Sequence, residues 1–147
     1  MSVKEKKLSF NNVLCISNSI RNDEITDTAN ELRRFIISHG LYPTGPLFYQ
    51  KIQKDQEEES EFRLFMPINT VVQIQGNSKL QFISSISFAN CIYVRKADSD
   101  DPMEESYENI REYARINNKT ITEDFYHVIL DVYGEQIVDI YAPVEVE

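Results

Sequence analysis

Residues 124–146 read DFYHVILDVYGEQIVDIYAPVEV, and they are the most informative part of the sequence. Two runs in it, 125–133 and 137–144, are rich in β-branched and aromatic residues, which favour strands. Between them lie Gly134-Glu135-Gln136, a segment short enough for a hairpin loop. The stretch therefore predicts a β-hairpin that closes the chain.

A sequence pattern similar to this hairpin occurs in the first half of the chain. Phe48-Tyr49 precedes Phe125-Tyr126 by 77 residues, and Pro67 precedes Pro143 by 76 residues. Two helical patterns repeat as well, since apolar residues recur at spacings of four, three and four in both halves: Ile25, Ala29, Leu32 and Ile36, and then Met103, Tyr107, Ile110 and Ala114. These matches predict a duplicated unit.

Each half reads strand, helix, strand, strand. We expect strands over 11–20, 47–53 and 62–74 and a helix over about 23–39 in the first half. In the second half, Asp101-Pro102 predicts the start of a helix. The fold class is therefore α+β, a tandem repeat of two βαββ units with an antiparallel sheet and two helices around a central cleft. We expect one domain over residues 1–147, with repeat one at about 9–75, repeat two at about 79–146, and a frayed charged lead-in over 1–8.

The charge and the residue composition of the chain favour some classes of function over others. The formal net charge of −9 over 147 residues disfavours nucleic-acid binding, because a polyanion is repelled, and favours cationic ligands or a basic protein partner. There is no secretion signal and no apolar run near the ~20 residues of a membrane span, so we expect a cytoplasmic protein without membrane attachment. The residue usage fits a bacterial source. Cys15 and Cys91 lie in apolar strand-like runs and are expected to be buried free thiols.

No motif in the sequence supports catalysis. There is no nucleophile elbow, phosphate loop or metal-ligand spacing, so we predict no catalytic residue, metal or cofactor. Aromatic residues instead dominate the repeated strands, and aromatic walls near a carboxylate suit a lipophilic cation. Packing within the core is the alternative explanation for such residues. The candidate cleft residues are Tyr49, Phe65, Tyr93, Phe125, His127 and Tyr141.

Strand alternation separates the residues of the segment after Asp124 into two sets. Phe125, His127, Ile129 and Asp131 share one face and form a mixed set that could face solvent or line a cleft. The other face carries Tyr126, Val128, Leu130 and Val132, and we expect this second set to be buried.

The order βαββ–βαββ resembles the GyrI-like effector-binding domain, on the motifs 45–49 (GPLFY), 66–69 (MPIN) and 139–144 (DIYAPV). The resemblance spans about residues 9–146 and implies two βαββ modules around a cleft that takes lipophilic cations or other small molecules. Some relatives are hydrolases acting on strained small molecules. Sensing members carry a Glu on the strand that here starts near Phe125, and this sequence has none there. No helix-turn-helix segment precedes the domain, so direct DNA binding is not expected.

Three functions follow as alternatives. The first is a stand-alone small-molecule-binding module with an aromatic cleft between the repeats. The second is an acidic protein-interaction module, suggested by the acidic stretches 55–61 and 98–105 and by the missing Glu. The third is a small hydrolase of the GyrI-like type, using a carboxylate or Tyr in the cleft. Whether the protein is an enzyme is left open by the sequence.

Overall fold

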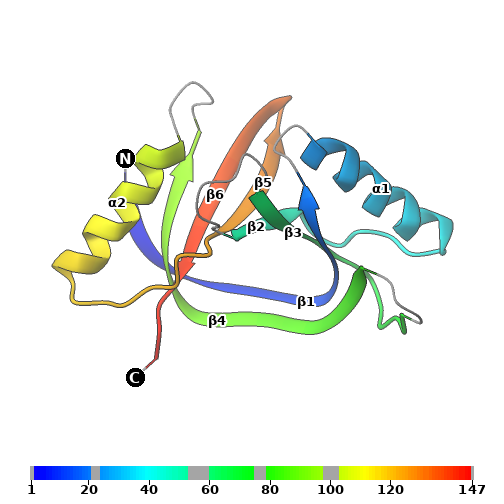
Figure 1. Cartoon of the computed structure of the whole chain (residues 1–147), viewed down its shortest axis with the longest axis horizontal. Helices are drawn as coiled ribbons and strands as arrows, with labels where there is room; N and C mark the ends of the chain where they lie inside the picture. The colour runs from blue at the N-terminus through cyan, green and yellow to red at the C-terminus, as the bar shows by residue number, and fades with distance from the viewer. Residues whose placement is uncertain (1, 21–23, 53–59, 75–78, 98–102, 147) are drawn as a thin grey trace. The chain divides into compact units, whose positions relative to one another are not determined.

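The computed structural model describes residues 2–20, 24–52, 60–74, 79–97 and 103–146. These residues contain six strands and two helices, in the order β1 (Val3–Ile20), α1 (Ile25–Ser38), β2 (Phe48–Ile52), β3 (Ser60–Pro67), β4 (Leu80–Lys96), α2 (Met103–Ile116), β5 (Tyr126–Val132) and β6 (Glu135–Pro143) (Figure 1). The α+β class and the repeated strand, helix, strand, strand order are as predicted. The expected helix start at Asp101-Pro102 and most of the acidic stretch 55–61 lie outside the described residues.

The chain forms two compact units. The first unit comprises Phe10–Ile86, and the second comprises Met1–Ser9 together with Ser87–Glu147. In the first unit β3 pairs with both β1 and β2, and every pairing is antiparallel. In the second unit β6 pairs with β4 and β5, again antiparallel. The last strand of each repeat is thus the middle strand of its own unit.

The internal details of the two units repeat closely. The buried residues of α1 and α2 correspond one to one at a separation of 78 residues: Thr28, Ala29, Leu32 and Ile36, against Ser106, Tyr107, Ile110 and Ala114. The Ile68 N–H donates to the Asn12 carbonyl, and the Val144 N–H donates to the Asn90 carbonyl in the same way. The duplication predicted from sequence is therefore present in the structure of each unit.

The register of β2 and β5 differs by one residue from the sequence match. Phe48 lies opposite Phe65 in the first unit, and Tyr126 lies opposite Tyr141 in the second. Tyr126, and not Phe125, is therefore the structural counterpart of Phe48. Because neighbouring residues of a strand point to opposite faces, this single residue changes which aromatic rings share a face.

The loop of the closing hairpin was predicted at Gly134-Glu135-Gln136, which begins one residue too late and ends two residues too late. Val132 pairs with Glu135, so the loop consists of Tyr133 and Gly134 alone. Both residues have positive φ, 53° and 82°, which is the geometry of a type I′ turn. The Gly134 N–H donates to Asp131 Oδ1 at 3.1 Å. The hairpin itself is confirmed.

The expected frayed lead-in is also wrong, because β1 begins at Val3. The carboxylate of Glu5 accepts hydrogen bonds from Asn90 Nδ2 at 2.7 Å and from the Tyr113 hydroxyl at 2.7 Å. Lys119 Nζ lies 3.3 Å from the same carboxylate. These donors, with that of Asn90 first, lower the pKa of Glu5 to about 2. The start of β1 is thereby attached to β4 and α2.

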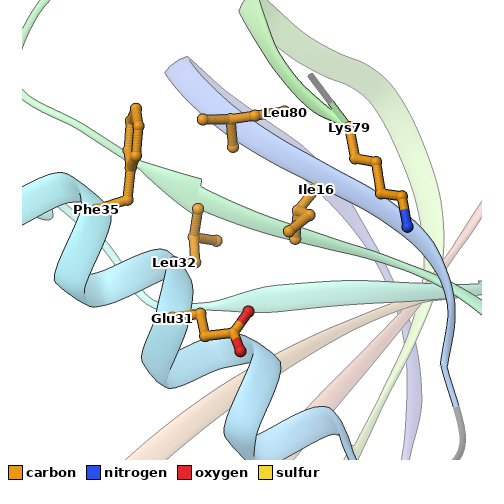
Figure 2. Close-up of a pocket in the computed structure, with 6 residues that line it drawn as sticks. All are labelled: Ile16, Glu31, Leu32, Phe35, Lys79 and Leu80. Carbon is orange, nitrogen blue, oxygen red and sulfur yellow. The ribbon is translucent and has the colours of Figure 1, made fainter. Parts of the chain in front are cut away.

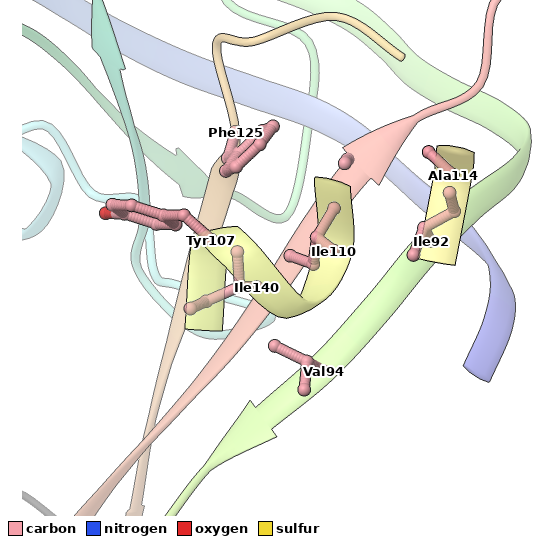
Figure 3. Packing of buried hydrophobic residues seen from close by; sticks show 8 residues of the cluster. Ile92, Val94, Tyr107, Ile110, Ala114, Phe125 and Ile140 are labelled. Carbon is pink, nitrogen blue, oxygen red and sulfur yellow. The ribbon is translucent and has the colours of Figure 1, made fainter. Parts of the chain in front are cut away.

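Helix α2 covers one face of the second unit's strands (Figure 3). Its apolar stripe consists of Tyr107, Ile110 and Ala114, and it packs against strand residues and the residue before β5: Ile92, Val94, Phe125, Ile140 and Ala142. The spacing of the stripe, predicted from the 3.6-residue period, is what brings these side chains onto the sheet. Neither helix in the described part of the chain is long and apolar enough to cross a membrane.

Candidate ligand-binding face

Three tyrosines form a row across the second unit on the face opposite α2. Tyr93 of β4 lies opposite Tyr141 of β6, and Tyr141 lies opposite Tyr126 of β5. Directly paired residues share a face, so all three rings project on the same side. The ring centroids of Tyr93 and Tyr141 are 5.0 Å apart and the rings are tilted by 47°. Phe88 extends the row, with its ring 5.5 Å from that of Tyr126.

An ion pair between Arg95 of β4 and Asp139 of β6 lies next to this row, two residues along each strand from Tyr93 and Tyr141. Arg95 Nε donates to Asp139 Oδ1 at 2.8 Å and Arg95 Nη2 donates to Oδ2 at 3.0 Å, a two-point contact between planar groups. Asp139 is only 4% exposed, whereas the Arg95 side chain is 49% exposed. We call Tyr93, Tyr126 and Tyr141, together with this ion pair, the tyrosine face.

The electrostatics of the tyrosine face favour neutral phenols. Burial raises the pKa of Tyr141 to about 12, and the negative charge of Asp139 contributes to the same rise. The pKa of Tyr93 is raised for the same two reasons, burial first. The Arg95 pKa is raised chiefly by its hydrogen bond to Asp139. At neutral pH the rings of Tyr93 and Tyr141 are therefore uncharged aromatic surfaces beside a compensated ion pair.

A cation already lies on this face. Lys6 Nζ lies 4.4 Å from the centroid of the Tyr93 ring. The Lys6 side chain is exposed, whereas Tyr93 is 5% exposed. An ammonium over an aromatic ring is the geometry of a cation–π contact. The Tyr93 ring is thus placed to attract positive charge.

The structure separates the six residues predicted for the cleft. Tyr93 and Tyr141 lie together on the tyrosine face. Phe125 and His127 lie on the face that α2 covers, where His127 is 1% exposed and its Nε2 is 2.7 Å from the Tyr107 hydroxyl. The Tyr107 ring makes edge contacts with both of them. In this unit, Phe125 and His127 belong to the core beneath the helix.

This placement differs in part from the faces expected for the closing hairpin: Val128 of the expected buried set is buried, at 5% exposed, but other residues are not where they were expected. The expected mixed set packs under the helix through Phe125 and His127, whereas Tyr126, Leu130 and Val132 of the expected buried set keep partial or full exposure. Helix α2 covers the face that carries Phe125 and His127, and this is why these two residues are buried.

The remaining two predicted residues belong to the first unit. Phe65 lies in the row equivalent to the tyrosine row, between Cys15 and Phe48, and stacks on Phe48 at 4.8 Å. All three members of this row are buried. Tyr49 projects to the opposite face and contacts the edge of the Phe62 ring at 5.9 Å. The first unit thus has an apolar row at the position of the tyrosine row.

Other chemistry is sparse in the described residues. They contain no group of three His, Cys, Asp or Glu side chains arranged to hold a metal ion. Cys15 and Cys91 are free and buried, and burial raises the pKa of each thiol to about 11. Both are therefore neutral thiols rather than reactive thiolates at physiological pH.

Sequence reasoning did not assign Lys6, Arg95, Asp139 or Tyr126 to the site. Residues two apart in a strand share a face, and this rule could have identified Arg95 and Asp139. Arg95 follows Tyr93 by two residues, and Asp139 precedes Tyr141 by two residues. Tyr126 was hidden by the one-residue difference in register, and the place of Lys6 depends on a contact distant in sequence.

Comparison with known families identifies the family to which the sequence is similar. A family model with the description Domain of unknown function (DUF5085) matches residues 9–147. No curated protein matches the sequence.

Solved structures share the fold at low sequence identity. The C-terminal domain of EcmrR has a TM-score of 0.75 and 16% identity, with 98% of this chain and 97% of that domain covered. In a complex of EcmrR with DNA, the TM-score is 0.72 and the identity 15%, with 97% of this chain covered; the matched part is 57% of that chain's length. A hydrolase from Listeria innocua has a TM-score of 0.65 and 8% identity, with 97% and 92% covered. SAV2435 bound to tetraphenylphosphonium has a TM-score of 0.52 and 12% identity, with 99% and 94% covered. The GyrI-like resemblance is thus supported at the level of the fold.

Proposed function

The chain belongs to the family described as Domain of unknown function (DUF5085), and we propose that it is a small-molecule-binding module whose tyrosine face binds a lipophilic organic cation. The observation that carries this proposal is the position of Lys6 Nζ over the Tyr93 ring at 4.4 Å, beside the Tyr141 ring. A ligand cation would take the place of this ammonium on the aromatic surface.

The chemistry of the face supports a ligand that carries both aromatic rings and a positive charge. Uncharged phenol rings supply area for stacking and for cation–π attraction. Asp139 supplies a nearby carboxylate, although Arg95 compensates its charge. The formal net charge of −9 adds a favourable long-range field for a cation.

The fold neighbours support the same class of ligand. SAV2435 was solved with tetraphenylphosphonium bound, and EcmrR contains a C-terminal domain of the same fold. Tetraphenylphosphonium combines four aromatic rings with one positive charge, which are the two properties that the tyrosine face would recognise. It is therefore the probe of choice.

Calorimetric titration of the intact chain tests the proposal. We expect tetraphenylphosphonium to bind more tightly than triphenylphosphine oxide, which has similar rings and no net charge. Tyr141→Leu should weaken binding by about tenfold, because a desolvated cation–π contact contributes up to about 2 kcal/mol. Tyr133→Leu is the matched control, since Tyr133 is fully exposed at the hairpin tip. Absence of binding, or equal binding by the Tyr141 variant, would contradict the proposal.

A further inference from the structure

The first unit contains a pocket that shares no residue with the tyrosine face. Its volume is about 240 Å³, and it lies between α1, β1 and the start of β4 (Figure 2). The lining residues are Ile16, Glu31, Leu32, Phe35, Lys79 and Leu80. This volume is below the roughly 300–1,000 Å³ of sites for drug-sized ligands, which suits a smaller ligand.

The inner wall of the pocket is apolar. Leu32 is buried, and Ile16, Phe35 and Leu80 are each partly exposed where they border the pocket. Phe35 is held in place by stacking on His39, with ring centroids 4.0 Å apart. The partly exposed apolar side chains would lose contact with water when an apolar group enters, which favours such a ligand.

Two opposite charges border the same pocket. Glu31 belongs to α1, and Lys79 lies just before β4, where its carbonyl accepts a hydrogen bond from the Ser17 N–H at 3.3 Å. In Figure 2 the carboxylate of Glu31 and the ammonium of Lys79 both lie away from Phe35 and Leu80. Within the described part of the chain, Glu31 has no hydrogen-bond or ion-pair partner.

We propose that this pocket binds a free α-amino acid with an apolar side chain. The apolar side chain would contact Leu32, Phe35 and Leu80, the α-ammonium group would face Glu31, and the α-carboxylate would face Lys79. A zwitterion of this kind matches one negative and one positive residue at once, whereas a simple amine or acid matches only one of them. The small volume favours a single amino acid over a peptide.

The experiment is an amide NMR titration of the intact chain with L-phenylalanine and L-leucine. Three related molecules test each part of the proposal: phenethylamine lacks the carboxylate, 3-phenylpropionate lacks the amine, and L-aspartate lacks the apolar side chain. The variants are Glu31→Gln and Lys79→Met. Asp27→Asn, also exposed on α1, and Lys7→Met, on β1, are matched controls that carry the same changes of charge.

We expect saturable shifts at Ile16, Leu32, Phe35 and Leu80 with the two apolar amino acids. Phenethylamine, 3-phenylpropionate and each pocket variant should bind about tenfold more weakly, since a contact to a charged group contributes about 1.5 kcal/mol or more. L-aspartate should also bind more weakly, because it brings no apolar side chain to the inner wall of the pocket. Both control variants should retain binding. The proposal would be overturned by an absence of shifts at these residues, by equal binding of phenethylamine or 3-phenylpropionate, or by full binding in both pocket variants. The tyrosine face is tested separately, because its residues and its probe are different.

Discussion

The ammonium of Lys6 lies 4.4 Å above the ring of Tyr93, so an exposed side chain from the start of β1 covers a buried aromatic residue of β4. A cation–π contact at an exposed position contributes only about 0.5–1 kcal/mol. We therefore expect a ligand with a larger aromatic surface to displace Lys6 from the Tyr93 ring. The contact both marks the proposed site and competes for it.

Replacement of this competitor should strengthen ligand binding. We expect Lys6→Ala to increase the affinity for tetraphenylphosphonium by about two- to fivefold, because the variant removes a like charge and a contact of about 0.5–1 kcal/mol. Lys7→Ala is the control, since it removes the same charge from the neighbouring position of the strand. Calorimetry on both variants makes the measurement. Weaker binding by Lys6→Ala than by Lys7→Ala would show that Lys6 supports the ligand instead.

The buried pair of Tyr107 and His127 should be important for stability. Tyr107→Phe removes the hydroxyl that lies 2.7 Å from His127 Nε2 and leaves the ring in place. A buried polar atom that loses a partner costs about 1–3 kcal/mol, so the free energy of unfolding should fall by that amount. Urea denaturation is the measurement, with Tyr133→Phe as the control. Equal stability of the two variants would argue against the Tyr107–His127 hydrogen bond.

The Glu5 carboxylate predicts a specific dependence on pH. Its folded pKa is about 2, below the unfolded value of about 4.3, so its contribution is complete above about pH 4.3 and disappears as the pH falls toward 2. Because the side chain is 31% exposed, we expect Glu5→Gln to cost only about 1 kcal/mol at pH 7. The difference in unfolding free energy from the unsubstituted chain should shrink in acid. A difference that stays constant from neutral pH to pH 2 would contradict the hydrogen-bonded, ionised state of the Glu5 carboxylate.

The hairpin turn offers a stabilising substitution. Tyr133 occupies the first central position of a type I′ turn with φ of 53°, a conformation that Asn adopts more readily than Tyr. Its side chain is fully exposed, so Tyr133→Asn should raise the free energy of unfolding by about 0.5–1 kcal/mol. Tyr133→Ser is the control, because Ser lacks the preference of Asn for positive φ. A decrease in thermal stability for Tyr133→Asn would argue against the type I′ geometry.

The duplication could be predicted from sequence because both helices carry the same pattern of apolar residues. The apolar positions of one helix recur in the other at a constant separation, as Leu32 and Ile110 show, and the 3.6-residue period reveals them without any tertiary contact. The order of elements follows from this repeat.

The faces of β5 could not be predicted with the same certainty. Phe48-Tyr49 and Phe125-Tyr126 match by residue type, but the pairing of Tyr126 with Tyr141 sets the strand one residue further along. A strand with aromatic residues at both neighbouring positions does not specify which ring faces the helix. Packing of Phe125 against Tyr107 decides it, and that contact joins elements distant in the chain.

The ordered start of β1 was hidden for a similar reason. Residues 3–7 read VKEKK, a charged sequence with little to indicate a strand. Glu5 is held by Asn90, Tyr113 and Lys119, all of which are distant in sequence. Only the folded chain brings these partners together, and with them Lys6 reaches Tyr93.

The most direct test of the tyrosine face is an amide NMR titration of the intact chain with tetraphenylphosphonium. We expect saturable shifts at Tyr93, Arg95, Tyr126 and Tyr141, with the amide of Lys6 shifting in the same concentration range. Residues of α2 on the opposite face of these strands, such as Ile110, should change little. Shifts confined to other residues, or none at all, would contradict the claim that this face binds the ligand.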